Sequence, residues 1–260
     1  MITDLLTPLI CPRFLSDERY RRGHVRIINA LPGRRIMGLH VPDMKRLAKQ
    51  LARRDDASGL LRGFVQEYAT DPLSLSYEET VVWGLTLNAL KCPPEERWAL
   101  VRDYVPVLDN WGVCDTFCCN TKWASRLPRE EVWAFLQPYF DSSREFEVRF
   151  AVVMTMCHLL HAEWLPRVFA RLEGIGFDSV RSHYLSPKEA RVRGVSEGVA
   201  LGNPPYYVRM SVAWLLATAL AKFPDETRAF VRRSTLPEDV KRLYVRKARE
   251  SFRTRGVEAL

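Results

Sequence analysis

Long apolar runs are missing from this chain of 260 residues. No stretch approaches the roughly 20 apolar residues that a membrane-spanning helix needs, so an integral membrane protein is not predicted. Residues 1–15 have short apolar runs broken by Pro8 and Pro12 and no basic leader, so we expect no signal peptide. Six cysteines are too few for a disulfide scaffold. We therefore expect a cytoplasmic protein with reduced thiols.

Alternating strand patterns are also scarce, and nearly every segment shows the helical period instead. One predicted helix begins at Val41-Pro42-Asp43, a second at Tyr77, and a third at Pro94, because proline favours the first turn of a helix. Further helices are predicted over 112–124, 129–139, 145–159, 163–173, 206–222, 225–233 and 237–251. The predicted fold class is therefore all-α.

Basic residues outnumber acidic residues in this chain. The formal net charge is +8 and hydrophobic residues make up 47%, which is typical of a folded, basic protein. Such an excess indicates a polyanionic partner, although many basic proteins bind none.

Two of the predicted helices resemble each other. Val148–Met154 aligns with Val208–Trp214 at an offset of 60 residues, and Thr80–Leu90 is a weaker third copy. Residues 177–203, rich in Gly, Ser, Arg and Pro, look inserted between the two. We predict one domain over 1–260, an α-solenoid of stacked helix pairs, with an irregular helical bundle as the alternative.

One carboxylate lies in apolar surroundings. Asp115 follows Trp111 by four residues, which puts both side chains on one helix face. In a solenoid the inner helices 112–124, 145–159 and 206–222 line a concave face, where Trp111, Asp115, Arg149 and Trp214 could converge. The structural alternative for Asp115 is a helix cap or a salt bridge with Lys122 or Arg149.

Four segments in order resemble the AlkD family of DNA alkylation repair glycosylases. They are NWGVCD (110–115), EFEVRFAVV (145–153), YYVRMSVAW (206–214) and KARESFR (247–253), and the resemblance covers roughly residues 25–253. The family implies HEAT-like repeats that cradle duplex DNA in a basic concave groove. It also implies excision of cationic N3- and N7-alkylated purines with the lesion left stacked. We expect a monomer that needs no cofactor and associates with the nucleoid through DNA.

Carried over by position, Asp115 matches the catalytic aspartate of the family. Trp111 and Trp214 match the aromatic pair beside the deoxyribose of the lesion, and Arg149 matches the arginine next to them. The best-studied pattern has a second tryptophan and an acidic residue where this chain has Asn110 and Gly112. Related branches on this scaffold lack glycosylase activity, so DNA binding without catalysis is the alternative function.

A single carboxylate suits this chemistry. A purine alkylated at N3 or N7 is cationic and leaves without a general acid, and positive charge then develops on the sugar. An anion beside the sugar stabilises that transition state more than the ground state, and indole faces add cation–π attraction of about 0.5–2 kcal/mol each.

Basic residues follow in the last predicted helix. We predict DNA contacts at Arg209, the repeat equivalent of Arg149, and at Lys241, Arg242, Arg246, Lys247 and Arg249. For each of these the alternative is a solvated surface face. The insert residues Arg181, Lys188, Arg191 and Arg193 either clamp DNA or form a loop.

No metal site is predicted. Cys114, Cys118 and Cys119 lie close together and a Cys157-His158-x-x-His161 segment follows, but neither has the paired spacing of a four-ligand zinc site. Cysteines buried at helix contacts are the simpler interpretation. Trp83, Trp98, Trp123, Trp133 and Trp164 are predicted core residues.

Overall fold

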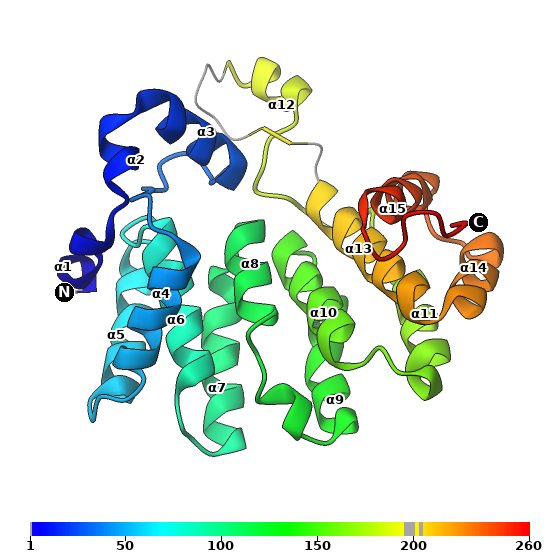
Figure 1. Cartoon of the computed structure of the whole chain (residues 1–260), viewed down its shortest axis with the longest axis horizontal. Helices are drawn as coiled ribbons and strands as arrows, with labels where there is room; N and C mark the ends of the chain where they lie inside the picture. The colour runs from blue at the N-terminus through cyan, green and yellow to red at the C-terminus, as the bar shows by residue number, and fades with distance from the viewer. Residues whose placement is uncertain (1, 195–200, 203–204) are drawn as a thin grey trace. The chain divides into compact units, whose positions relative to one another are not determined.

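The computed structural model describes residues 2–194, 201–202 and 205–260, and within them the protein is all-α (Figure 1). Four 3-10 turns, at Thr7–Leu9, Val105–Val107, Ala124–Arg126 and Ala162–Trp164, join the helices. The fifteen α-helices of the described residues are α1 Ile2–Leu6, α2 Pro12–Ser16, α3 Glu18–Ile28, α4 Val41–Leu51, α5 Ala57–Thr70, α6 Tyr77–Ala89, α7 Pro94–Tyr104, α8 Trp111–Cys118, α9 Arg129–Phe140, α10 Glu145–His158, α11 Leu165–Glu173, α12 Pro187–Val192, α13 Tyr206–Lys222, α14 Pro224–Arg233 and α15 Glu238–Glu250.

The helix predicted over 112–124 is the clearest error of the sequence interpretation. Helix α8 ends at Cys118, because two side chains take up carbonyl groups of its last turn. Asn120 Nδ2 donates to Thr116 O at 2.6 Å, and Thr121 Oγ1 donates to Cys118 O at 2.6 Å. Short polar side chains of this kind compete with the backbone and end helices.

The chain divides into two compact units. Unit 1 holds the residues up to Lys122 and also Gly194, and unit 2 holds Trp123–Arg193 and the described residues from Leu201 onward.

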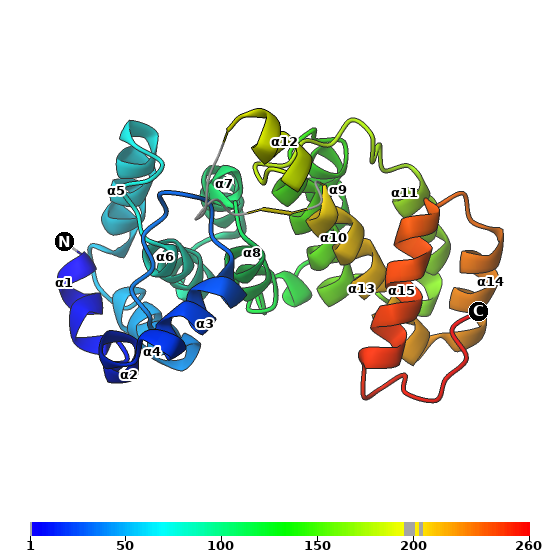
Figure 2. The ribbon, with the colours of Figure 1, turned by 90° about the horizontal axis from the view of Figure 1, so that it is seen from above.

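Unit 1 has a central helix, α6, that is buried on nearly all sides. It packs against α4 and α8 in one row, and against α5 and α7 on its other side (Figures 1 and 2). A capping box starts α6: Ser76 Oγ accepts from Glu79 N at 3.2 Å, and Glu79 Oε2 accepts from Ser76 N at 2.7 Å. This cap fixes the point where α6 begins next to α8.

Unit 2 has two such buried helices, α10 and α13, which pack against each other. Helix α9 covers α10, while α14 and α15 cover α13 (Figure 1). A buried carboxylate joins the two central helices, since Glu145 Oε1 accepts from Tyr207 N at 2.5 Å and from Val208 N at 3.3 Å. Glu145 thus satisfies amide groups at the N-terminus of α13 that have no partner inside the helix.

The aligned arginines of the sequence repeat occupy matching places in unit 2. Arg149, near the start of α10, donates from Nη1 to Tyr207 O near the start of α13, at 2.7 Å. Arg209, near the start of α13, reaches Asp239 near the start of α15, with 2.8 Å between Nε and Oδ2. Each arginine therefore links its own helix to the start of the next helix in the row.

The segment predicted as an insertion, 177–203, belongs to unit 2 up to Arg193 and again at Leu201 and Gly202. It contains α12 and buries Phe177, Val180 and Tyr184. Isolated β-bridges pair Arg144 with Arg181 and Leu185 with Leu201. Residues 195–200 and 203 of this segment lie outside the described residues. Within the described residues, no helix is both long and apolar enough to cross a membrane.

Candidate functional site

The N-terminus of α8 carries the Trp111–Asp115 pair, and Asn110 holds it in place. Asn110 is 1% exposed and caps the helix, with its Oδ1 accepting from Gly112 N at 2.7 Å. Its Nδ2 donates to Ile28 O at 2.8 Å and to Asn29 O at 3.3 Å. One amide thus caps α8 and ties it to the C-terminus of α3, where Asn29 adopts a left-handed conformation with φ of 50°.

The indole of Trp111 is oriented by the same end of α3. Trp111 Nε1 donates to Ile27 O at 3.2 Å, and the residue is half-buried. A carbonyl at the end of a helix has no partner within the helix, so this bond satisfies both groups. The indole is therefore held at the surface of unit 1 in a defined orientation. Helix α3 is not among the helices predicted from the sequence, so its role in holding Trp111 was missed.

Gly112 is required by the close approach of Tyr77. A Cβ atom at position 112 would lie 2.4 Å from the Tyr77 hydroxyl oxygen and 3.1 Å from Asn110 Oδ1. Burial raises the pKa of Tyr77, and the negative charges of Glu78 and Asp115 raise it further, so this phenol stays neutral. Asn110 and Gly112, the two departures from the family pattern, therefore have structural roles at this helix start.

Asp115 lies one turn after Trp111 on α8 and is half-buried, between the buried residues Cys114 and Phe117 along the chain. Its charge is close enough to Tyr77 to affect the pKa of that phenol. A carboxylate that keeps some solvent exposure on one helix face with an indole can meet a ligand there. The structure thus confirms the shared helix of Trp111 and Asp115.

A buried ion pair supports the segment before α8. Arg34 Nη2 pairs with Asp109 Oδ2, and the two side chains are 4% and 9% exposed. Arg34 Nη1 also donates to Pro72 O at 2.6 Å and to Leu75 O at 2.9 Å. Arg34, which precedes α4, therefore links the loop before α6 to Asp109, the residue before Asn110. Buried pairs of this kind destabilise a protein strongly when one partner is removed.

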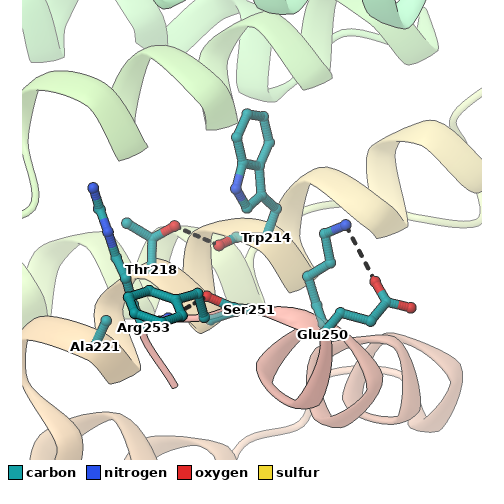
Figure 3. Close-up of a pocket in the computed structure, with 9 residues that line it drawn as sticks. Trp214, Thr218, Ala221, Glu250, Ser251 and Arg253 are labelled. Carbon is teal, nitrogen blue, oxygen red and sulfur yellow. Dashed lines mark hydrogen bonds and ion pairs between the residues drawn. The ribbon is translucent and has the colours of Figure 1, made fainter. Parts of the chain in front are cut away.

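Trp214 lies in unit 2, half-buried on α13, where it lines a pocket of about 360 Å³ (Figure 3). We call this the tail pocket, because the end of α15 and the chain after it supply the other side. It is lined by Trp214, Ala217, Thr218, Ala221, Lys247, Glu250, Ser251, Phe252 and Arg253. Trp214 and Lys247 are among the predicted site residues, whereas Phe252 is not.

Arg149 is 4% exposed in unit 2. Besides its bond to Tyr207 O, its guanidinium lies 5.9 Å from the centre of the Tyr207 ring. Its charge also lowers the pKa of Glu145, against a larger upward effect of burial on that carboxyl. Arg149 therefore helps to hold the start of α13, the helix that carries Trp214. A place for Arg149 beside the deoxyribose of the lesion stays a prediction.

Arg209 is engaged inside unit 2 as well. Besides its ion pair with Asp239, its guanidinium lies 5.4 Å from the centre of the Phe177 ring, and the side chain is 16% exposed. Its Nη1 is buried without a hydrogen-bond partner among the described residues. Contact of Arg209 with DNA also stays a prediction.

The basic side chains of α15 fall into two groups. Lys241 pairs with Glu238 at 3.1 Å, and both Arg246 and Lys247 pair with Glu250, at 3.5 and 3.4 Å. Arg242 and Arg249 are exposed and have no ion pair among the described residues. Free exposed cations are the better phosphate contacts, because no local carboxylate has to be displaced. These two are therefore the strongest candidates on α15.

No disulfide joins the six cysteines, all of which lie in described residues. Burial is confirmed for Cys114 and Cys118 but wrong for Cys119 and Cys157. Of the five tryptophans predicted to lie in the core, Trp83, Trp98, Trp133 and Trp164 are buried, whereas Trp123 is half-buried.

These features define an all-α protein of packed helices that presents an indole–carboxylate pair in one unit and a second indole beside basic side chains in the other. The chain belongs to the family of DNA alkylation repair enzymes, whose model matches residues 16–175. That match includes Trp111, Asp115 and Arg149, and it ends before Trp214 and α15. Neither the curated proteins nor the solved structures with which the chain was compared gave a match.

Proposed function

We propose that this protein is a monofunctional DNA glycosylase that hydrolyses the N-glycosidic bond of cationic N3- or N7-alkylated purines in duplex DNA. The observation that carries the proposal is the half-exposed Trp111–Asp115 pair, held at the start of α8 within the part of the chain that matches the repair family. Membership of that family supports action on alkylated DNA, and the pair supplies the groups that cleavage of this bond requires.

The proposed reaction needs one carboxylate. The alkylated purine leaves with the electrons of the glycosidic bond and becomes neutral, because it was cationic at the start. Asp115 stabilises the positive charge that develops on the deoxyribose and orients the water whose oxygen bonds to the sugar. One proton of that water passes through the carboxylate to the solvent. The face of Trp111 lies beside the same sugar and contributes cation–π attraction. No acid is needed to protonate the leaving base.

The proposal includes the HEAT-like repeat fold. The helix rows α4–α6–α8 of unit 1 and α10–α13–α15 of unit 2 each support it, because neighbouring helices in each row pack side by side as in a solenoid. We propose that Trp214 and Arg149 act on the same DNA, and that the exposed cations Arg242 and Arg249 contact its phosphates.

Substitution of Asp115 by asparagine tests the assignment, because asparagine keeps the shape and removes the charge. We expect release of 7-methylguanine from methylated duplex DNA to fall on the order of 10²–10³-fold, the range seen when one preorganised electrostatic group is removed. Asp103→Asn is the matched control, since Asp103 is exposed on α7 of the same unit. Equal release by both variants and the unsubstituted protein would rule out the role of Asp115.

DNA binding without base excision is the second candidate. The observation in its favour is the start of α8, where Asn110 and Gly112 serve the cap and the Tyr77 contact in place of the tryptophan and acidic residue of the best-studied family pattern. This function predicts salt-dependent binding of duplex DNA. It also predicts that no base is released, whether or not Asp115 is substituted.

A further inference from the structure

The tail pocket has an exposed aromatic ring that the proposed cleavage does not use. Phe252 is 94% exposed, although it is a large apolar side chain. A single exposed apolar residue is common in soluble proteins and means little alone. Here, however, the ring lines a pocket of about 360 Å³ together with the indole of Trp214, close to the lower end of the roughly 300–1,000 Å³ typical of ligand sites.

The chain around Phe252 is anchored on both sides, so its exposure is built into the fold. Before it, Ser251 Oγ accepts from Arg253 N at 3.3 Å. After it, Thr254 is 1% exposed, its Oγ1 donates to Ala248 O at 2.6 Å, and its N donates to Ser251 O at 3.1 Å. These bonds form a turn that follows α15 directly and leaves the ring at the surface.

The pocket is also cationic. Lys247 and Arg253 line it. Glu250, which pairs with Lys247 at 3.4 Å, is the one acidic residue in the lining, so two cations stand against one carboxylate. Figure 3 shows the side chains of Trp214 and Arg253 extending to the same side of the pocket. Two small side chains, Ala217 and Ala221, also line the pocket.

Two aromatic rings, cations and a ligand-sized space are the elements that recognise an unpaired nucleotide. Bases of single strands stack on aromatic side chains, and basic residues hold the adjoining phosphates. We infer that the tail pocket binds one unstacked nucleotide of a DNA strand, with its base against Phe252 and its phosphate at Arg253 and Lys247. This inference rests on the DNA binding of the proposed function and not on base excision.

The test measures binding of a fluorescently labelled short oligothymidylate by anisotropy. We expect Phe252→Ala to weaken binding by about 5- to 150-fold, which corresponds to the roughly 1–3 kcal/mol of one base–aromatic stack at 1.4 kcal/mol per tenfold. Phe252→Trp keeps a stacking ring and should retain the affinity. Val192→Ala is the matched control, since Val192 is 80% exposed on α12 of the same unit, and it should bind like the unsubstituted protein.

The phosphate contact is tested separately through salt dependence. Arg253→Gln should make the slope of log K against log salt less steep by about 0.7, the value for one phosphate of a single strand. Equal affinity of Phe252→Ala and Val192→Ala for oligothymidylate would overturn the inference. The inference would also be overturned if Phe252→Ala changed self-association in sedimentation but left DNA binding unchanged. The pocket would then be a contact between copies of the protein.

Release of 7-methylguanine is measured on the same proteins, so the two proposals can fail separately. Phe252-dependent oligothymidylate binding without base release supports the inference and rules out the glycosylase. Base release together with oligothymidylate binding that does not depend on Phe252 supports the glycosylase and overturns the inference.

Discussion

At the scale of single residues, Gly112 shows how a departure from a family pattern can be structural. A Cβ atom at position 112 would lie 2.4 Å from the Tyr77 hydroxyl oxygen, which is closer than a side chain atom can approach without a shift of Tyr77. The Asn110 amide, two residues earlier, takes the capping position for the same helix. The start of α8 is therefore determined by Tyr77 and by the end of α3, both distant in sequence.

Gly112→Ala should destabilise the protein by about 1–3 kcal/mol, the usual cost of adding a methyl group to a close-packed site. Gly63→Ala on α5 is the control, because nothing lies within 4 Å of the added Cβ and helix propensity favours alanine. Adding Tyr77→Phe to the Gly112→Ala variant should recover part of the loss. Denaturant unfolding measures all four proteins, and equal destabilisation by the two alanine substitutions would contradict the packing argument.

His158, at the end of α10, makes stability depend on pH. Its Nδ1 lies 2.8 Å from Ser125 Oγ, and burial lowers its pKa from 6.5 to about 4. Between these values the unfolded chain binds the proton and the folded protein does not, so stability is lost as the pH falls.

We expect the unfolding free energy of the protein to drop, relative to that of His158→Gln, by up to about 3 kcal/mol as the pH falls from 6.5 to 4. Glutamine can still pair with Ser125 but does not titrate. Thermal or denaturant unfolding of both proteins across this range provides the comparison, and parallel pH profiles would show that His158 is not responsible.

At the scale of elements, the sequence predicted the central helices well because their apolar periodicity and capping signals are local. The starts at Val41, Tyr77 and Pro94 are confirmed. The helices α3 and α5 were missed, since α3 is strongly polar and α5 contains Gly59 and Gly63, which weaken helical propensity. Asp17, which caps α3 by accepting from Tyr20 N at 3.0 Å, was a usable local signal.

The candidate site was predictable only in part, for a similar reason. The Trp111–Asp115 spacing is visible within one turn of helix, so the pair could be selected from sequence. The Ile27 carbonyl that orients Trp111, the Tyr77 hydroxyl beside Gly112 and the Phe252 turn depend on contacts between distant segments. Contacts between distant segments leave no periodic pattern in the sequence, so they could not be predicted from it.

The basic side chains of helix α15 should determine part of the salt dependence of DNA binding. Arg242→Ala and Arg249→Ala should each make the slope of log K against log salt for duplex DNA less steep by about 0.9, because each removes one phosphate contact. Lys241→Ala should change it less, since Glu238 pairs with Lys241. Arg232→Ala on α14, an exposed arginine of the same unit, is the control. Unchanged slopes for both Arg242→Ala and Arg249→Ala would place the DNA elsewhere.

At the scale of the whole molecule, the residues proposed to act on DNA are divided between the two units. Trp111 and Asp115 lie in unit 1, whereas Trp214, Arg149 and the cations of α15 lie in unit 2. The model of the repair family covers Trp111, Asp115 and Arg149 and ends before Trp214 and α15.

The central claim is that Asp115 drives base release, and single-turnover excision from a duplex with one 7-methylguanine tests it most directly. The account predicts release well above the spontaneous rate for the unsubstituted protein, lost on the order of 10²–10³-fold in Asp115→Asn and retained in Asp103→Asn. Release at the spontaneous rate by the unsubstituted protein, with duplex binding intact, would contradict the claim and leave DNA binding as the function.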